Sequence, residues 1–141
     1  MRSTFVVGVL LLAIGAAIAL IVVLDRAEAS VEARVRRYAL AITLADADAA
    51  LAEISPLERD TYTGFVDRQL GNIYEVRGIA VRAPSLLQRL LARPPAGPTE
   101  VTVILDVNRG YAEDYYMPTT QVPLESVDGV WYLARPLLAK D

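Results

Sequence analysis

The sequence predicts an α+β protein in which one N-terminal transmembrane helix is followed by further helices and then an antiparallel sheet. Three observations support this prediction. Residues Phe5–Leu24 carry no charge, helical spacing of apolar residues continues to about residue 70, and alternating apolar positions dominate from Thr99 onward. A run of helices followed by antiparallel strands is typical of α+β folds.

The N-terminal apolar run is long enough to cross a membrane. At about 1.5 Å per residue it spans roughly 30 Å, the thickness of the hydrocarbon core of a bilayer. The chain of 141 residues is 54% hydrophobic, which is above the usual share for soluble domains. We therefore predict a signal-anchor helix over residues 1–25 and one α+β domain over residues 26–141, enough for a single small core.

A cleaved signal peptide is the alternative to a retained anchor. Ala27-Glu28-Ala29 has the small-x-small pattern after which signal peptidase cuts. The apolar run is longer than the ~7–15 residues of a signal-peptide core, and Asp25 and Arg26 stand between the run and the cut. These features favour a retained anchor and leave cleavage after Ala29 open.

Small residues within the span predict a contact with a second helix. Gly15 and Ala19 are four residues apart, with Ala16 beside them, and this spacing lets two helices approach closely. Ala and Gly are also common in apolar helices that have no partner. The pattern is therefore a hypothesis about an interface.

The charges that follow the span bear on its orientation. Arg26, Arg34, Arg36 and Arg37 would place the domain in the cytoplasm by the positive-inside rule. Folded domains, however, translocate largely regardless of charge. The 13 arginines against one lysine hint at a GC-rich bacterial genome. We predict a single-pass protein of the bacterial cytoplasmic membrane with its domain outside the cytoplasm, and the reverse orientation stays open.

Apolar spacing also predicts how the domain begins. A stripe of residues from Val31 to Ala45 predicts a helix that continues from the span, because no Pro or Gly intervenes. Arg34 and Arg37 fall off this stripe. Asp46 or Asp48 then caps a short helix through Leu51.

The next helix is predicted from a capping motif. Ser55-Pro56-Leu57-Glu58 has the form of a capping box with Pro in the first turn. It predicts a helix from Pro56 to about Leu70, and Gly71 marks the end.

The strands are predicted from period-two alternation. Ile73–Arg82 changes its apolar parity at Gly78, which predicts a bulge. Thr99–Val107 places its apolar residues on one face. The other expected elements are a helix over Ser85–Ala92, a strand over Tyr111–Leu124 broken at Pro118 and Pro123, a turn at Asp128-Gly129 and a closing strand over Val130–Arg135.

Missing residue types exclude several classes of function. The chain contains no His and no Cys, which excludes Ser-His-Asp and Cys-His catalysis and thiolate metal sites. A net charge of −3 does not suit a nucleic-acid binder. We therefore expect no catalytic residue, no cofactor, no metal site and no nucleic-acid partner.

Two stretches resemble the nuclear transport factor 2-like (SnoaL-like) superfamily. Residues 38–56, YALAITLADADAALAEISP, are similar to its opening helix, acidic break and second short helix. Residues 122–133, VPLESVDGVWYL, are similar to its final hairpin. The resemblance implies a cone-shaped domain of helices packed on a curved antiparallel sheet. Its membrane-tethered members, among them the type IV secretion inner-membrane scaffold and the Mce-associated membrane proteins of actinobacteria, are assembly or accessory components.

Aromatic residues of the final strands predict a partner-binding surface. Tyr111, Tyr115, Tyr116 and Trp131 are of the types favoured at interfaces, and packing within the sheet is the alternative. Asp106 has the parity opposite to the apolar face of its strand, so we expect a solvated acid on the outside of the sheet. A general base inside the cone is the other interpretation.

These features together predict a non-catalytic accessory or assembly subunit of a larger membrane protein complex. The expected partners are the lipid bilayer and other membrane protein subunits. One alternative is a membrane-tethered domain that holds a small apolar ligand. A further alternative is an isomerase or hydrolase that uses Asp or Tyr as its base.

Overall fold

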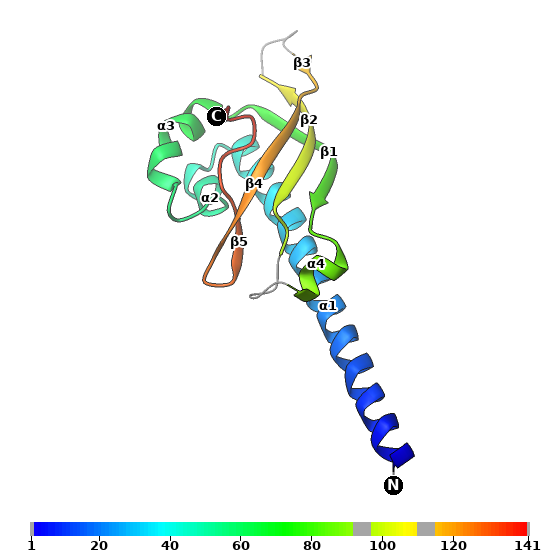
Figure 1. Cartoon of the computed structure of the whole chain (residues 1–141). Coiled ribbons are helices and arrows are strands. Elements are labelled where there is room, and N and C mark those ends of the chain that lie inside the picture. Colours follow the sequence, from blue (N-terminus) through cyan, green and yellow to red (C-terminus); the bar gives the residue numbers. More distant parts are fainter. Residues whose placement is uncertain (1, 92–96, 110–114, 141) are drawn as a thin grey trace.

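One long helix, α1 (Arg2–Thr43), joins the N-terminus to the centre of the domain (Figure 1). The computed structural model describes residues 2–91, 97–109 and 115–140. The N-terminal half of α1 projects away from the rest of the chain, and an antiparallel sheet curls around its C-terminal half as half of a barrel. The α+β prediction and the continuation of the first helix through Asp25 are both confirmed.

The sheet has the strand order β1-β2-β4-β5, and a short strand, β3, pairs with the end of β2. Its strands are β1 (Ile73–Arg82), β2 (Glu100–Asn108), β3 (Tyr115–Tyr116), β4 (Thr119–Val127) and β5 (Val130–Leu133). Neighbouring strands are antiparallel throughout. The edge of β5 is extended by a parallel bridge between Leu133 and Ile54, which adds the segment after the second helix to the sheet.

The core lies between α1 and the concave face of the sheet. The predicted stripe of α1 is fully buried at Val31, Val35, Tyr38 and Ile42. The predicted face of β2 is fully buried as well, at Val101, Val103, Leu105 and Val107. Each fully buried aliphatic side chain contributes about 1.5–3 kcal/mol, so this shared core, to which β1, β4 and β5 also contribute, is the main source of the stability of the domain.

Gly78 carries the predicted bulge in β1. The register with β2 shifts between Val76 and Gly78. Tyr74 and Val76 before the shift and Ile79 after it therefore pack against the same core. Without the bulge, period-two alternation would turn one of these groups to the outer face.

The last turn of α1 fixes the start of β1. The N–H of Gly71, which has a φ of +82°, donates to the carbonyl of Ile42 at 2.9 Å. The N–H of Tyr74 donates to the Thr43 hydroxyl at 3.0 Å. Two backbone groups near the first residues of the sheet are thus bonded to the end of the helix that the sheet covers.

Two short helices lie where the sequence predicted them. α2 (Ala47–Ala52) is capped by Asp46, whose carboxylate accepts the Ala49 N–H at 3.0 Å. α4 (Leu86–Leu91) lies within the predicted range Ser85–Ala92, of which Ala92 is outside the described residues.

The predicted start of the next helix is wrong. α3 (Arg59–Gln69) begins three residues after Pro56, and Glu58 makes no capping bond through its side chain. Ser55 is used in a turn instead: its hydroxyl accepts the Leu57 N–H at 3.3 Å and its carbonyl accepts the Glu58 N–H at 3.0 Å. The Ser55 N–H itself donates to Leu133 at 2.8 Å, which holds this segment against β5.

The predicted strand over Tyr111–Leu124 differs from the structure. Residues 110–114 lie outside the described part of the chain, and Pro118 separates β3 from β4 as predicted. Pro123 does not break β4, because it stands where β4 exchanges β2 for β5 as its partner, and a missing N–H is tolerated there. The predicted Asp128-Gly129 turn is confirmed, with positive φ at both residues. β5 ends at Leu133 instead of Arg135, before Pro136.

Gly97 is predicted to be intolerant of any side chain. A Cβ there would lie 2.0 Å from Cζ2 of Trp131, whose ring is held against the core. Gly97→Ala should therefore destabilise the protein by about 1–3 kcal/mol. Gly64→Ala is the matched control: its Cβ would approach only Arg68, at 3.7 Å, and should stabilise α3 by about 0.5–1 kcal/mol. Denaturation followed by the fluorescence of Trp131, the only tryptophan, measures both, and equal stability of the two variants would contradict the prediction.

Candidate functional site

The N-terminal half of α1 is the most unusual surface of the protein. Its most apolar window of 18 residues has a mean hydropathy of 3.1, and none of that window is buried inside the protein. Leu12, for example, is 76% exposed. A helix that is apolar on all sides is stable only where apolar surroundings cover it. α1 is thus long and apolar enough to cross a membrane.

The small residues predicted as a helix–helix interface lie on this uncovered half. Gly15, Ala16 and Ala19 are all exposed. A Cβ added to Gly15 would meet no atom within 4 Å, and the same is true of Gly8, seven residues earlier on the same side of the helix. Within the described chain this side of α1 is free for another helix.

A buried ion cluster joins α1 to the end of α2. The carboxylate of Glu53, which is only 8% exposed, accepts from Arg34 at 2.7 Å and from Arg37 at 2.7 Å. The apolar spacing predicted Arg34 to lie off the buried stripe, but Arg34 is only 8% exposed because it pairs with Glu53. The spacing of Arg34 and Arg37 could have indicated a shared acidic partner, since residues three apart lie on the same side of a helix. The partner, Glu53, could not be identified from that spacing.

Tyr132 extends this cluster to β5. Its ring lies under the guanidinium of Arg34, at 4.3 Å, and near that of Arg59, at 5.9 Å. Arg59 also donates to the carbonyls of Ile54 and Ala52, each at 3.1 Å. The cluster therefore connects α1, the α2–α3 segment and the last strand at one point.

Burial and pairing shift the two arginines of the cluster in opposite directions. Desolvation lowers the pKa of Arg34, and the charge of Glu53 opposes this effect. The hydrogen bond to Glu53 raises the pKa of the more exposed Arg37. Both side chains stay cationic at physiological pH, so the carboxylate is held by two positive charges.

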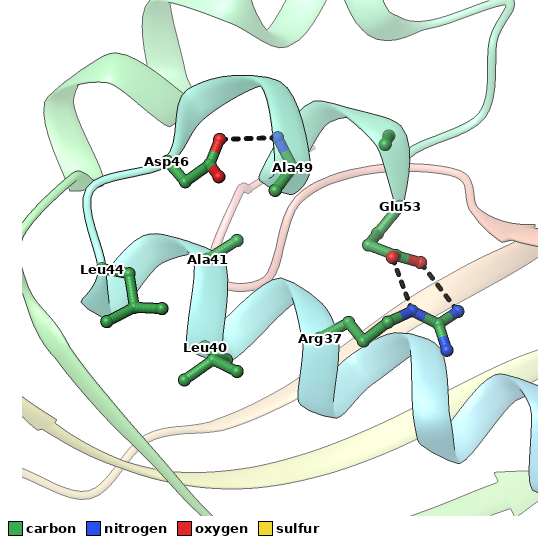
Figure 2. Close-up of a pocket in the computed structure, with 8 residues that line it drawn as sticks. Arg37, Leu40, Ala41, Leu44, Asp46, Ala49 and Glu53 are labelled. Atoms are coloured by element: carbon green, nitrogen blue, oxygen red, sulfur yellow. Dashed lines mark hydrogen bonds and ion pairs between the residues drawn. The ribbon is translucent and has the colours of Figure 1, made fainter.

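A groove of about 350 Å³ runs between α1 and α2 beside this cluster. Figure 2 shows Leu40, Ala41 and Leu44 on one wall, with the Arg37–Glu53 ion pair at one end and Asp46 at the other. Leu40 and Leu44 are 57% and 68% exposed. The groove is thus apolar along its length and polar at its ends, and it opens to the surface.

A second hollow, of about 450 Å³, lies at the opposite end of the domain from the projecting half of α1. It is more polar than the α1–α2 groove. Its lining residues include Phe65, Gln69, Arg109, Tyr116 and Lys140. The guanidinium of Arg109 lies 5.1 Å from the ring of Tyr116.

Of the predicted aromatic residues, the structure holds Tyr115 and Tyr116 together in β3 and places Trp131 apart from them. Tyr111 lies outside the described residues. Tyr115 and Tyr116 pair with the end of β2, whereas Trp131 pairs with Ser126 in the hairpin at the other end of the sheet. Tyr115 is 58% exposed, while Trp131 packs against the core. The strand register, which the sequence does not show, separates these residues.

Asp106 lies on the outer face of the sheet, as predicted, but it is not solvated. Arg77 covers it with an ion pair, and Asp106 is only 4% exposed. The hydrogen bond from Arg77 lowers the pKa of Asp106 below its usual range. The carboxyl group is therefore ionised and engaged, and it faces away from the concave side of the sheet.

Two phenols in the core bear on acid–base chemistry. Burial raises the pKa of Tyr38 and of Tyr74 well above the usual value for tyrosine. Both groups therefore stay protonated at neutral pH. Among the residues that the structure describes, no three carboxylate groups come close enough to hold a metal ion.

Comparison of the chain with protein-family models, curated proteins and solved structures found no match. The features of this chain that bear on its function are the exposed helix, the ion cluster and the grooves.

Removal of the Glu53 carboxylate should strongly destabilise the domain. Glu53→Ala leaves the buried guanidinium of Arg34 without its counter-charge, and loss of one partner of a buried pair costs about 3–5 kcal/mol. Glu32→Ala removes an exposed acid from α1, the helix that carries Arg34, and should change the free energy of unfolding by no more than about 0.5 kcal/mol. Urea denaturation in detergent compares the two. A Glu53→Ala effect as small as that of Glu32→Ala would show that the cluster is not a structural link.

Proposed function

We propose that this protein is a non-catalytic single-pass membrane protein that serves as an accessory or assembly subunit of a larger membrane protein complex. The continuity of α1 carries this proposal. No Pro or Gly interrupts the chain between Gly15 and the end of α1, and one helix links the apolar half to the core. A domain on such a rod keeps a fixed height and angle above a bilayer, which suits a stationary partner.

We place the anchor in the bacterial cytoplasmic membrane and the domain outside the cytoplasm. Two of the arginines that would count toward a cytoplasmic domain, Arg34 and Arg37, are bonded to Glu53 within the fold. They act as residues of a folded domain, whose translocation depends little on charge. This supports the proposed orientation.

Kinship with the nuclear transport factor 2-like superfamily is part of the same proposal. It is supported by the order of the elements, helices first and a curled antiparallel sheet after them. The wrapping of the sheet around α1 supports it as well. The membrane-tethered members of that superfamily suggest an accessory or assembly role.

The small-residue side of α1 is the proposed contact with a partner helix in the membrane. Gly15→Leu with Ala19→Leu would place two large side chains on this side and hold the partner helix away. Purification in mild detergent should then lose the copurifying membrane subunits. Ala13→Leu with Ala17→Leu is the matched control, because it places the same two leucine side chains at the same spacing about 200° around the helix.

The control variant should keep the copurifying subunits. A wild-type chain that purifies as a monodisperse monomer without partners would refute the assembly function. Equal loss in both double variants would refute the assignment of the interface to Gly15 and Ala19.

A second candidate function, a membrane-tethered domain that holds a small apolar ligand, is supported by the α1–α2 groove. Its volume is at the lower end of the range of about 300–1,000 Å³ for small-molecule sites. Its apolar walls with polar groups at the ends resemble such sites in character.

This candidate predicts a small molecule that remains with the purified protein. Ala49→Phe should fill the groove, since Ala49 is one of its lining residues, and native mass spectrometry should then show loss of the bound molecule. Ala33→Phe, at an exposed position of α1 outside the groove, should retain it. Absence of any bound molecule in the wild type, or its persistence in Ala49→Phe, would count against the candidate.

A further inference from the structure

α4 is held against α1 at the base of the domain, where the N-terminal half of α1 emerges (Figure 1). Arg89 makes this attachment. It donates to the carboxylate of Glu28 at 2.8 Å and to the carbonyl of Pro84 at 2.7 Å. The Arg89 side chain is only 10% exposed, so the guanidinium is enclosed between the two helices.

The height of this attachment can be measured along α1. Glu28 is four residues beyond Leu24, the last residue of the apolar run, which corresponds to about 6 Å along the helix. The headgroup layer on each side of a bilayer is about 5–7 Å thick. When α1 spans the membrane, α4 therefore lies at the depth of the lipid headgroups.

The free side of α4 carries two exposed leucines. Leu87 is 66% exposed and Leu91 is 75% exposed, and their spacing of four residues places them on one face of the helix. The turn of the β4–β5 hairpin lies at the same end of the domain, and its Val130 is 41% exposed. This end therefore presents apolar side chains at the height where water gives way to lipid.

Basic side chains stand at the same level. Arg26 follows the apolar run directly, and Arg82 ends β1 just before the segment that leads to α4; both are exposed. Apolar residues flanked by arginines are the composition of helices that lie in the membrane interface. Such arginines also attract the phosphates of anionic lipids.

We propose that the base of the domain is a lipid-binding surface in which Leu87 and Leu91 of α4 insert into the headgroup region of the bilayer that α1 crosses. The occupant of this apolar face is the phospholipid interface. This inference rests on the proposed membrane span and adds to it, because a second contact with the bilayer fixes the tilt of α1 and the side of the domain that faces the lipid.

Site-directed spin labelling of the full chain tests the proposal. The chain has no cysteine, so Leu87→Cys and Leu91→Cys each introduce a single labelling position. Labelled protein is placed in vesicles of phosphatidylcholine and phosphatidylglycerol, and nitroxide collisions with oxygen and with a water-soluble nickel chelate are compared. Leu44→Cys is the matched control: Leu44 is 68% exposed and directly follows the last residue of α1, about 30 Å beyond Leu24.

Labels at 87 and 91 should show an oxygen-to-nickel collision ratio several-fold above that at 44. A ratio equal to that at 44 would overturn the proposal. Low collision rates with both reagents would also overturn it, because they would indicate a protein contact in place of lipid. A further variant, Ile14→Cys, distinguishes failure of the lipid-binding surface from failure of the membrane span. Hydrocarbon depth at 14 with aqueous values at 87 and 91 refutes the lipid-binding surface alone, whereas aqueous values at 14 refute the membrane span as well.

Discussion

α1 has to satisfy two different surroundings with one unbroken backbone, and the arrangement of the other elements depends on this constraint. Its first half is apolar on all sides and has no cover in the described chain, while its second half is apolar on the side that the sheet encloses. β1 starts from hydrogen bonds to the last turn of α1, and α4 is tied to it at Glu28. Because a helix is stiff, the position of the whole domain relative to the exposed half follows from α1.

The rotation of the surrounding elements about α1 is specified by charge as well as by packing. Apolar contacts with the concave sheet are not directional. Glu53 binds Arg34 and Arg37 on one edge of α1, and Tyr132 lies under Arg34, so the α2–α3 segment and β5 meet the helix at one side only. Burial of Arg34 and Glu53 carries a desolvation cost, which the short hydrogen bonds between them and from Arg37 offset. We therefore regard the cluster as a determinant of specificity in the fold.

The exposed surfaces follow one another along α1 in the order membrane interior, membrane surface and water. The side of Gly15 and Ala19 belongs to the apolar half, the leucines of α4 stand at its boundary, and the α1–α2 groove lies near the other end of the helix. The proposed contacts are thus a partner helix in the membrane, the lipid headgroups at its surface and a ligand above it. Because α1 is one continuous helix, the domain keeps the same orientation in all three contacts, so they can form at the same time.

Elements whose signals are local could be predicted from the sequence alone. Helical spacing, the alternation in β2, the bulge at Gly78 and the Asp128-Gly129 turn were all predicted correctly, because residues close in the chain produce them. The other features depend on contacts that form only when the chain folds. Ser55 lies in a turn and not at the predicted helix cap, because its N–H bonds to Leu133 of a strand far along the chain. Arg77 covers Asp106 with an ion pair. The strand register places Trp131 apart from Tyr115. Each outcome depends on a partner that is distant in sequence, and side-chain spacing carries no information about such partners.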